Sequence, residues 1–362
     1  MRIVDEDEDL PLDRTPQAEP TVLVKEWRRV TPVLSETLAK KQNGCFQTGA
    51  MGPQEIEPCV VYWDWAEYEH VYQDDDLQIK RKKQQRKQVK FLLLPEAIKP
   101  HAYHSADVAI RALKKKDWQA CARSANGQPR GRKLTLGWLP QLPGRSVGSD
   151  YYNVRTAPTL AYPDLIAALY QLLQNMDDLL RDNLHEYHNY AWNASMNMLR
   201  PEGEKDDLSR IEVDRHRRII ESLDSWDWTY TIRGTVFSTV ELNRNIIFKA
   251  HPDRNNVNGT CVCITTLGSF AGGRLVFPRY GYSAELAPRD VLVCDNNKEL
   301  HGNLGPIVGE RFSVVAYQHK SLLWRTPVTE RIKAQYSSGR RTQVDDLSAS
   351  VMSQIRTPLL SR

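Results

Sequence analysis

Long hydrophobic runs are missing from this 362-residue chain, although hydrophobic residues make up 41% of it. Polar residues interrupt every apolar stretch before it reaches the length that a membrane-spanning helix needs. The first residues are acidic rather than basic and then apolar, so the pattern of a secretory signal is missing as well. These absences predict a soluble protein without a membrane partner.

Paired cysteines are also missing: the chain has 6 cysteines, and none of them forms a C-x-x-C pair. Cys261, Cys263 and Cys294 lie in apolar runs typical of strands, where a reduced cysteine behaves as a small hydrophobic residue. This usage is typical of a reducing compartment, nuclear or cytoplasmic, and of the two we expect the nucleus.

The chain has no large excess of charge of one sign, because it contains 49 lysines and arginines and 45 aspartates and glutamates, for a formal net charge of +4. Any nucleic-acid contact therefore has to come from local patches. A basic run at residues 80–83 is typical of a solvated helix face or localisation signal, or else of a phosphate-contacting patch. A second patch occupies a loop near residues 123–133. The candidate phosphate contacts are Lys80, Arg81, Lys82, Lys83, Arg130, Arg132 and Lys133.

The pattern of residue types divides the chain into four parts. Residues 1–57 begin with a block of acidic residues and show no sustained period, which predicts a disordered tail. Residues 58–210 are predicted to be a helix-rich supporting part that carries the basic patches. Residues 211–325 change to short strands and turns and form the predicted core, and residues 326–362 are expected to be a loose tail.

Within the supporting part, residues 60–72 predict a strand that turns into a helix. Residues 107–122 have helical spacing, with Val108, Leu113 and Trp118 expected to face inward. The prolines and glycines of residues 135–149 predict an irregular loop. A clear apolar period with a proline at its start predicts helix over residues 163–197.

In the core, short β-branched or aromatic runs alternate with Gly, Pro, Asn or Asp. This spacing predicts an α+β fold whose core is a double-stranded β-helix, a jelly roll of the cupin type, with helices packed on its outside. The expected strands are 228–237, 246–250, 259–267, 275–277, 284–286, 291–294 and 312–317.

The most informative motif of the core is His251-x-Asp253, followed further on by His301 and Arg311. An H-x-D alone is weak evidence, but this one follows a strand-like run, so its side chains would project into a barrel mouth. Two imidazoles and one carboxylate can occupy one face of a ferrous ion. A guanidinium can bind a dicarboxylate with two parallel hydrogen bonds. The alternative is histidines satisfied in a core and an arginine paired on the surface, but the combination favours an iron(II) and 2-oxoglutarate oxygenase.

The order of motifs around these residues is more specific than any one of them. The chain resembles the TET/JBP family of 2-oxoglutarate oxygenases in its motifs over residues 230–321, and it lacks the cysteine-rich zinc-binding extension, as the compact members do. The matching motifs are Gly272-Gly273-x-Leu275, the strand from Val291, Leu300-His301-Gly302, Gly309-x-Arg311-x-Ser313, and the stretches 251–259 and 311–319.

The resemblance implies an enzyme that oxidises the methyl group of a modified base in nucleic acid. It implies that His251, Asp253 and His301 form the catalytic Fe(II) site, and that Arg311 and Ser313 hold 2-oxoglutarate. Molecular oxygen would be the co-substrate, and DNA with methylated bases the partner. We expect a monomer.

Three further positions correspond to substrate-binding residues of the family, where the base is flipped out of the helix: Asn256, His319 and Tyr317. They favour oxidation of 5-methylcytosine to 5-hydroxymethylcytosine and on to formyl and carboxyl forms, with N6-methyladenine or a substrate other than nucleic acid as alternatives. The alternative interpretation of Asn256 is a loop-capping side chain, and that of His319 is a surface histidine at a strand end. The chain departs from the family at Pro252, inside the H-x-D, and at Arg289, where glycine is common.

Overall fold

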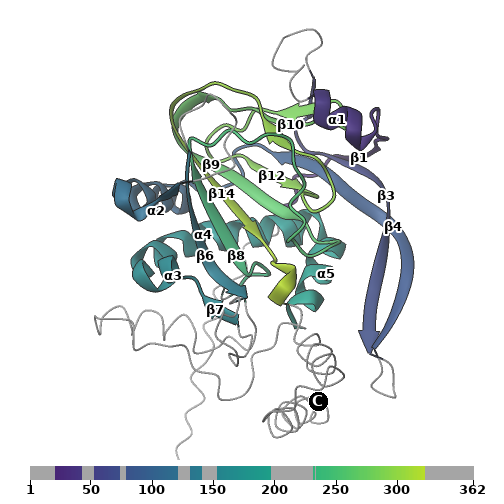
Figure 1. The fold of residues 1–362 in the computed structure, drawn as a ribbon, viewed down its shortest axis with the longest axis horizontal. Coiled ribbons are helices and arrows are strands. Elements are labelled where there is room, and N and C mark those ends of the chain that lie inside the picture. Colours follow the sequence, from purple (N-terminus) through teal and green to yellow (C-terminus); the bar gives the residue numbers. More distant parts are fainter. Residues whose placement is uncertain are drawn as a thin grey trace, which may run out of the picture.

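Two β-sheets pack against each other, and helices cover the outer face of the larger sheet (Figure 1). The computed structural model describes residues 21–42, 53–73, 79–120, 131–140, 153–196, 231–232 and 234–322. The helices of the described residues are α1 (Glu36–Gln42), α2 (Pro100–Arg111), η2 (Lys115–Asp117), α3 (Ala157–Ala161), α4 (Pro163–Asn183), α5 (His185–Met196) and η4 (Lys320–Leu322).

The larger sheet has 10 strands in the order β1-β3-β4-β12-β9-β14-β8-β6-β5, with β7 paired to β6. The smaller sheet has 4 strands in the order β13-β10-β11-β2. The larger sheet consists of β1 (Glu26–Arg29), β3 (Val60–Gln73), β4 (Ile79–Leu94), β5 (Gln119–Ala120), β6 (Arg132–Pro140), β7 (Asn153–Arg155), β8 (Thr239–Arg244), β9 (Val262–Gly272), β12 (Val291–Cys294) and β14 (Ile307–Tyr317). The smaller sheet consists of β2 (Gln54–Glu55), β10 (Leu275–Phe277), β11 (Tyr282–Ala284) and β13 (Gly302–Asn303).

From β8 onward the chain passes back and forth between the two sheets. Strands β8, β9, β12 and β14 lie in the larger sheet, and β10, β11 and β13 lie in the smaller one. The pairs β12–β9, β9–β14, β14–β8, β10–β11 and β10–β13 are all antiparallel. This alternation is that of a double-stranded β-helix, so the predicted jelly-roll core with helices outside is confirmed.

Strand β14 separates two apolar cores, because successive side chains of a strand point to opposite faces. Phe312, Val314 and Ala316 belong to the core beneath the helices. Val315 and Tyr317 pack against the core between the two sheets. The same alternation places Arg311 and Ser313 on the face that looks into the space between the sheets.

Helix α4 confirms the predicted helical region and forms much of the outer core. Its apolar residues recur every three or four positions, which places them along one face, and Pro163 and Asp164 occupy its first turn. A second helix, α5, follows directly. None of the described helices combines the length and the apolar character needed to cross a membrane. The buried hydrophobic residues of α4 are Leu165, Ile166, Leu169, Leu172, Leu173, Met176, Leu179 and Leu180.

The expected tail over residues 1–57 is wrong for the described part, residues 21–42 and 53–57. Strand β1 pairs in parallel with β3, and β2 pairs in parallel with β11. These short strands are held by backbone hydrogen bonds to an existing sheet edge. Because any side chains allow such bonds, the strands leave no hydrophobic period in the sequence. Residues 1–20 and 43–52 lie outside the described residues.

The expected helix after residue 60 is also wrong, because β3 continues as one strand to Gln73 and pairs with β4 over most of its length. Residues 80–83 therefore lie on a strand rather than on a helix face. The hairpin of β3 and β4 reaches beyond the body of the molecule (Figure 1). The supporting part over residues 58–210 thus contributes strands to the main sheet as well as helices.

Two further expectations fail in the supporting part. Helix α2 ends at Arg111, and Val108 is 53% exposed, because the buried stripe is Ala102, Ala106 and Ile110 at intervals of one turn. Trp118 is buried as expected. Residues 135–140 form part of β6 instead of a loop, and residues 141–149 lie outside the described residues.

The strands expected in the core agree best with the observed strands where the sequence has consecutive apolar residues. Strands β9, β10, β12 and β14 overlap four of the predicted runs, and β11 is displaced toward the N-terminus of another. The strand predicted over residues 228–237 is wrong in its described residues, 231–232 and 234–237, which form turns before β8. The run at 246–250 forms no regular strand and leads into an isolated bridge at His251.

Candidate metal and cosubstrate site

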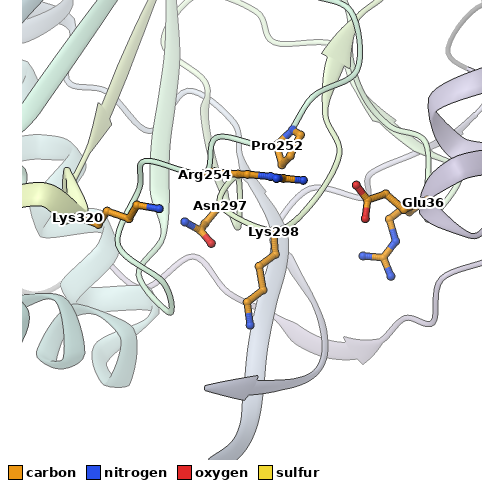
Figure 2. A pocket seen from close by; sticks show the side chains of 7 residues that line it. Glu36, Pro252, Arg254, Asn297, Lys298 and Lys320 are labelled. Carbon is orange, nitrogen blue, oxygen red and sulfur yellow. The ribbon is translucent and has the colours of Figure 1, made fainter. Parts of the chain in front are cut away.

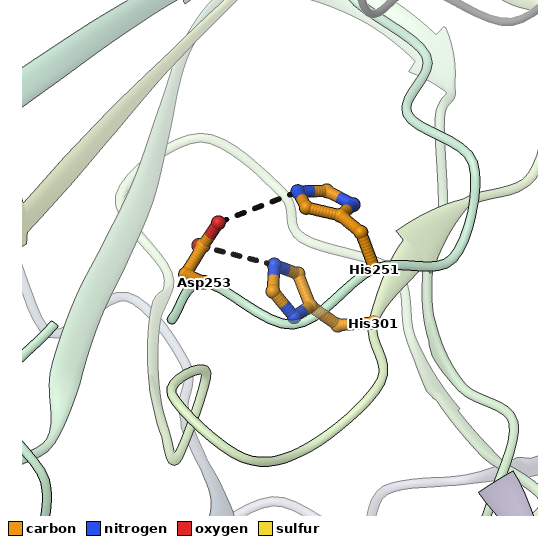
Figure 3. Close-up of side chains that lie close together, drawn as sticks. All are labelled: His251, Asp253 and His301. Atoms are coloured by element: carbon orange, nitrogen blue, oxygen red, sulfur yellow. Dashed lines mark ion pairs between the residues drawn. The ribbon is translucent and has the colours of Figure 1, made fainter. Parts of the chain in front are cut away.

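The structure brings His251, Asp253 and His301 together from two separate loops (Figure 3). His251 and His301 form an isolated antiparallel bridge, in which the backbone N–H of each donates to the carbonyl of the other, at 2.9 and 3.1 Å. The backbone N–H of Asp253 donates to the carbonyl of Asn296 at 2.7 Å. The ligand atoms of the three side chains all lie within 4.8 Å of one another.

The imidazole rings are held with their Nε2 atoms toward the carboxylate. Nδ1 of His251 lies 2.7 Å from the carbonyl oxygen of Lys249, and Nδ1 of His301 lies 3.1 Å from that of Glu299. Since a carbonyl only accepts hydrogen bonds, both Nδ1 atoms carry the proton, and both Nε2 lone pairs are available to a metal. Asp253 Oδ1 is 3.4 Å from Nε2 of His251, and its Oδ2 is 3.3 Å from Nε2 of His301.

The carboxylate of Asp253 is ionised in this setting. Burial alone would raise its pKa, but the charge of the His301 and His251 rings when both of their nitrogens are protonated, and the hydrogen bonds that their Nε2 atoms then donate, hold the pKa well below its usual range. Two imidazole nitrogens and one carboxylate oxygen converge on one point, and this donor set suits divalent iron with further positions open, because a metal that binds the Nε2 atoms displaces any proton from them. The predicted iron ligands therefore fit the metal.

Arg311 is a buried cation beside this site. Its side chain is 5% exposed, and burial lowers its pKa to about 10, so it stays charged at neutral pH. Its guanidinium lies 5.6 Å from the ring of Phe270. Among the described residues its Nε has no hydrogen-bond partner and no carboxylate pairs with it. A buried charge left in this way is strongly unfavourable, so the site fits an anionic ligand such as the distal carboxylate of 2-oxoglutarate.

The backbone around Arg311 fixes where that cation lies. The side-chain oxygen of Asn245 accepts from the N–H of Arg311 at 2.7 Å, and the N–H of Asn245 donates to the Arg311 carbonyl at 2.9 Å. A Cβ on Gly273, whose φ is +73°, would lie 3.4 Å from Cδ of Arg311 and closer still to Ile307. Ser313 is the next residue of β14 on the same face and is also buried, as the resemblance implies for a cosubstrate contact.

The three residues predicted to bind the base lie together. Asn256 and His319 form an isolated antiparallel bridge, and the rings of Tyr317 and His319 lie 6.4 Å apart. Asn256 is 4% exposed, and its Nδ2 has no partner among the described residues, which a loop cap would not explain. His319 is 8% exposed rather than on the surface, and burial lowers its pKa to about 4, so the ring is neutral at pH 7.

The predicted phosphate contacts are spread over the structure. Residues 80–83 lie on the hairpin strand β4, and Arg130 lies outside the described residues. The Arg132 guanidinium donates to the carbonyl of Lys115 at 2.9 Å, and Nζ of Lys133 lies 3.2 Å from the carboxylate of Glu241. Both therefore have partners within the protein, and a role for this set in phosphate binding stays a prediction.

The two departures from the family pattern have different surroundings. Arg289 has a φ of 76°, the left-handed conformation in which glycine is favoured, and its Nε donates to the carbonyl of Ile98 at 2.9 Å. That hydrogen bond holds the arginine in the turn. Pro252 leaves both neighbouring ligands in place and faces an open pocket.

Sequence reasoning missed a buried ion cluster behind the metal site. Lys90, which follows the basic run of residues 80–83 in the chain, is 3% exposed, and its Nζ lies 2.7 Å from Glu299 and 3.4 Å from Asp295. Arg279 binds the other oxygen of Glu299 at 2.7 Å. The backbone carbonyl of Glu299 orients the ring of His301, so the cluster anchors the loop that carries a ligand. The only signal in the sequence is a lysine directly before the apolar run of residues 91–94.

The fold and these side chains define a jelly-roll protein with a two-histidine, one-carboxylate metal centre beside a buried arginine. Residues 150–320 match the Tet_JBP family, described as the oxygenase domain of the 2OGFeDO superfamily. The match falls on the part of the chain whose motifs resemble this family.

Individual relatives match over shorter stretches. The bifunctional helicase and thymine dioxygenase JBP2 of Leishmania major is 36% identical over 109 residues, which cover 29% of this chain and 10% of that protein. Thymine dioxygenase JBP1 of Leishmania infantum is 36% identical over 73 residues, which cover 20% of this chain and 9% of that protein. The match thus spans about a tenth of the length of these relatives. The solved structure of NgTET1 in complex with 5mC DNA has 15% sequence identity and a TM-score of 0.45, and covers 80% of this chain and 93% of that one.

Proposed function

We propose that this chain is an iron(II)- and 2-oxoglutarate-dependent dioxygenase that oxidises the methyl group of a methylated base in DNA. The observation that carries the proposal is the buried guanidinium of Arg311, which has no ion-pair partner among the described residues, in the same jelly roll as the converging ligands His251, Asp253 and His301. A metal site alone would serve many reactions. A metal site with a separate buried cation is suited to a cosubstrate that chelates the metal and carries a second carboxylate.

The protein's own residues supply positions and charges for this reaction. His251, Asp253 and His301 would hold the iron, and Arg311 with Ser313 would hold the far carboxylate of 2-oxoglutarate. When bound, iron and cosubstrate supply the oxidation, in which O2 and 2-oxoglutarate give succinate and CO2 while one oxygen atom enters a methyl C–H bond. Because a base within a helix cannot reach a buried metal, it has to be flipped out and held by its edge.

The base-edge residues favour a pyrimidine methylated at C5. The Asn256 amide offers both a donor and an acceptor, which suits the amino group and ring nitrogen of 5-methylcytosine. The neutral ring of His319 adds one donor or acceptor beside it. We therefore put 5-methylcytosine first. Thymine is the second candidate, because it carries the same C5 methyl group and because the JBP relatives are named thymine dioxygenases. N6-methyladenine presents a similar amino edge and stays in the comparison.

The test uses duplexes in which every thymine is replaced by uracil, so that each substrate carries one kind of methyl group. Separate duplexes contain only 5-methylcytosine, only thymine or only N6-methyladenine, and succinate release is compared with mass spectrometry of the product nucleosides. The proposal expects oxidised nucleosides from one duplex with the parent and none with Asp253→Ala. Equal turnover by the parent and by Asp253→Ala, or succinate release that no methylated duplex stimulates, would contradict it. The masses also show whether oxidation continues to formyl and carboxyl forms.

A further inference from the structure

An open pocket of about 450 Å³ adjoins the metal-binding loop (Figure 2). Pro252, which lies between two metal ligands in the chain, forms part of its wall, and so does Lys320, the neighbour of His319. The pocket therefore adjoins the segments that carry the metal ligands and the base-edge residues. Its lining residues are Glu36, Pro252, Arg254, Arg279, Asn297, Lys298 and Lys320.

The lining is strongly cationic, with four basic side chains and one carboxylate, Glu36. Two of the basic side chains already have a partner: Arg279 pairs with Glu299, and Nζ of Lys298 donates to the carbonyl of Glu67 at 2.7 Å. Within the described part of the chain, the side chains of Arg254 and Lys320 form neither an ion pair nor a hydrogen bond. Arg254 is exposed and Lys320 is half-buried, so both are available to an anion from solvent.

The pocket is tied to the base-edge residues by backbone contacts. The N–H of Lys320 donates to the carbonyl of Asn255 at 2.8 Å. The side-chain amide of Asn297 donates to the carbonyl of Asn256. These bonds fix the pocket lining relative to the Asn256–His319 bridge, so an anion held in the pocket has a set position relative to a base held by that bridge.

We propose that this pocket binds a phosphodiester group of the DNA strand next to the base that enters the metal site, which rests on the function proposed above. Cationic side chains that contact phosphates supply affinity independent of sequence and fix the register of the nucleic acid. A nucleotide flipped out of a helix keeps its flanking phosphates close to its base, so the enzyme needs a cationic site beside the base site. Arg254 and Lys320 are the phosphate contacts, and Lys298 and Arg279 shape the pocket around them.

The first test measures duplex binding by fluorescence anisotropy over a series of salt concentrations. The parent is compared with Arg254→Ala, Lys320→Ala and the control Lys115→Ala, which removes the same charge from an exposed residue of η2, next to the edge strand β5. Each pocket variant is expected to raise Kd about tenfold at low salt and to reduce the slope of log K against log salt by about 0.9. The control is expected to bind with the slope of the parent. In a separate arm, inorganic phosphate is added as a competitor, and chloride at the same ionic strength is the control. If phosphate displaces no more duplex than chloride does, the ligand of the pocket is the phosphodiester chain.

The second test separates this inference from the proposed function by comparing turnover on a methylated duplex with turnover on the free methylated nucleoside, which has no phosphate. The pocket variants are expected to raise KM for the duplex, to keep kcat, and to oxidise the nucleoside as the parent does. Arg254→Lys is expected to restore part of the duplex affinity that Arg254→Ala loses.

If the duplex KM and the salt slope of the pocket variants match those of the Lys115→Ala control while the parent oxidises DNA, the pocket inference is wrong and the proposed function stands. If the slopes fall as expected while the parent oxidises no base, the proposed function is wrong, and the pocket is a phosphodiester site without a reacting base beside it. A parent that binds no DNA, or pocket variants that lose nucleoside turnover as well, would overturn the pocket inference.

Discussion

The backbones of His251 and His301 hold each other in place, since the N–H of each donates to the carbonyl of the other at 2.9 and 3.1 Å. The bridge joins two loops of the jelly roll that are far apart in the chain, and it sets their side chains 4.7 Å apart between ring centroids. The ligand positions are thus determined by backbone pairing, and the carbonyls of Lys249 and Glu299 determine the direction of each ring. A site fixed in this way is preorganised for a metal ion.

Arg311 supplies a prediction in which stability and cosubstrate binding change in opposite directions. In Arg311→Met, a buried charge without a partner among the described residues is replaced by an apolar side chain of similar length. We expect the Tm of the variant without cosubstrate to equal or exceed that of the parent. The KM for 2-oxoglutarate should rise at least about 100-fold.

Thermal unfolding with metal, in the presence and absence of 2-oxoglutarate, checks both halves of this prediction. Addition of 2-oxoglutarate should raise the Tm of the parent and leave that of Arg311→Met unchanged, since only a ligand that binds the native state stabilises it. A variant that still gains stability from 2-oxoglutarate would remove Arg311 from the cosubstrate site.

His319 predicts a loss of stability in mild acid. Burial, aided slightly by Lys320, lowers the pKa of its ring from 6.5 to about 4, so the unfolded chain takes up a proton between these pH values and the folded protein does not. Its contribution is fully present above pH 6.5 and is lost as the pH falls toward 4, by about 3 kcal/mol at most. In His319→Gln, the free energy of unfolding should depend less on pH in this window.

Urea unfolding at pH 7, 6, 5 and 4 measures the effect on His319→Gln. His104→Gln serves as the control, because His104 is an exposed residue of α2. The control should retain the pH dependence of the parent. If the two variants behave alike between pH 6.5 and 4, the ring of His319 is not held neutral by burial.

The iron ligands and Arg311 could be predicted from the sequence because metal chemistry restricts both the residue types and their order along the chain. Strands such as β12, with four consecutive buried residues, were also visible as apolar runs. The hairpin of β3 and β4 was not, because polar and basic residues on paired strands look the same as those on a solvated helix until the pairing is known. Strands β1 and β2 likewise depend on backbone pairing with distant strands.

Lys90 shows most clearly where sequence reasoning ends. Six basic residues within the eleven preceding it suggested a solvated side chain, yet the structure buries it among carboxylates. Its partner Glu299 is 209 positions away in the chain, and no local pattern contains that information. The same distance explains why the support of the metal-binding loop was missed.

Replacing Lys90 should destabilise the protein and weaken metal binding together. Lys90→Met leaves Asp295 and Glu299 buried without their ammonium partner, which costs about 3–5 kcal/mol of stability. Because the Glu299 carbonyl orients His301, iron affinity should fall by about 10- to 100-fold as well. Urea unfolding and a titration with Co(II), followed by absorbance, measure the two effects. Lys87→Met, at an exposed position of the same strand, is the control, and equal stability of the two variants would show that the cluster contributes nothing.

Asn256 gives the prediction that bears most directly on the substrate. Its Nδ2 is buried without a partner among the described residues, a cost that a bound base edge would remove. Asn256→Ala should therefore lower turnover on the methylated duplex at least about tenfold, while binding of metal and 2-oxoglutarate stays as in the parent. Asn255→Ala is the matched control, because the neighbouring side chain is exposed, and within the described residues it is the backbone carbonyl of Asn255 that is engaged, by Lys320.

The informative measurement for Asn256→Ala is the ratio of succinate release to base oxidation. If Asn256 holds the base, the variant should release succinate without a matching amount of oxidised nucleoside, because the cosubstrate still binds while the methyl group is no longer fixed at the metal. Loss of cosubstrate binding would instead assign Asn256 to the support of the adjacent Asp253 loop, whose carbonyl accepts from the Asn256 N–H at 3.0 Å. Turnover equal to that of Asn255→Ala would leave the orphaned amide without a role in recognition of the base.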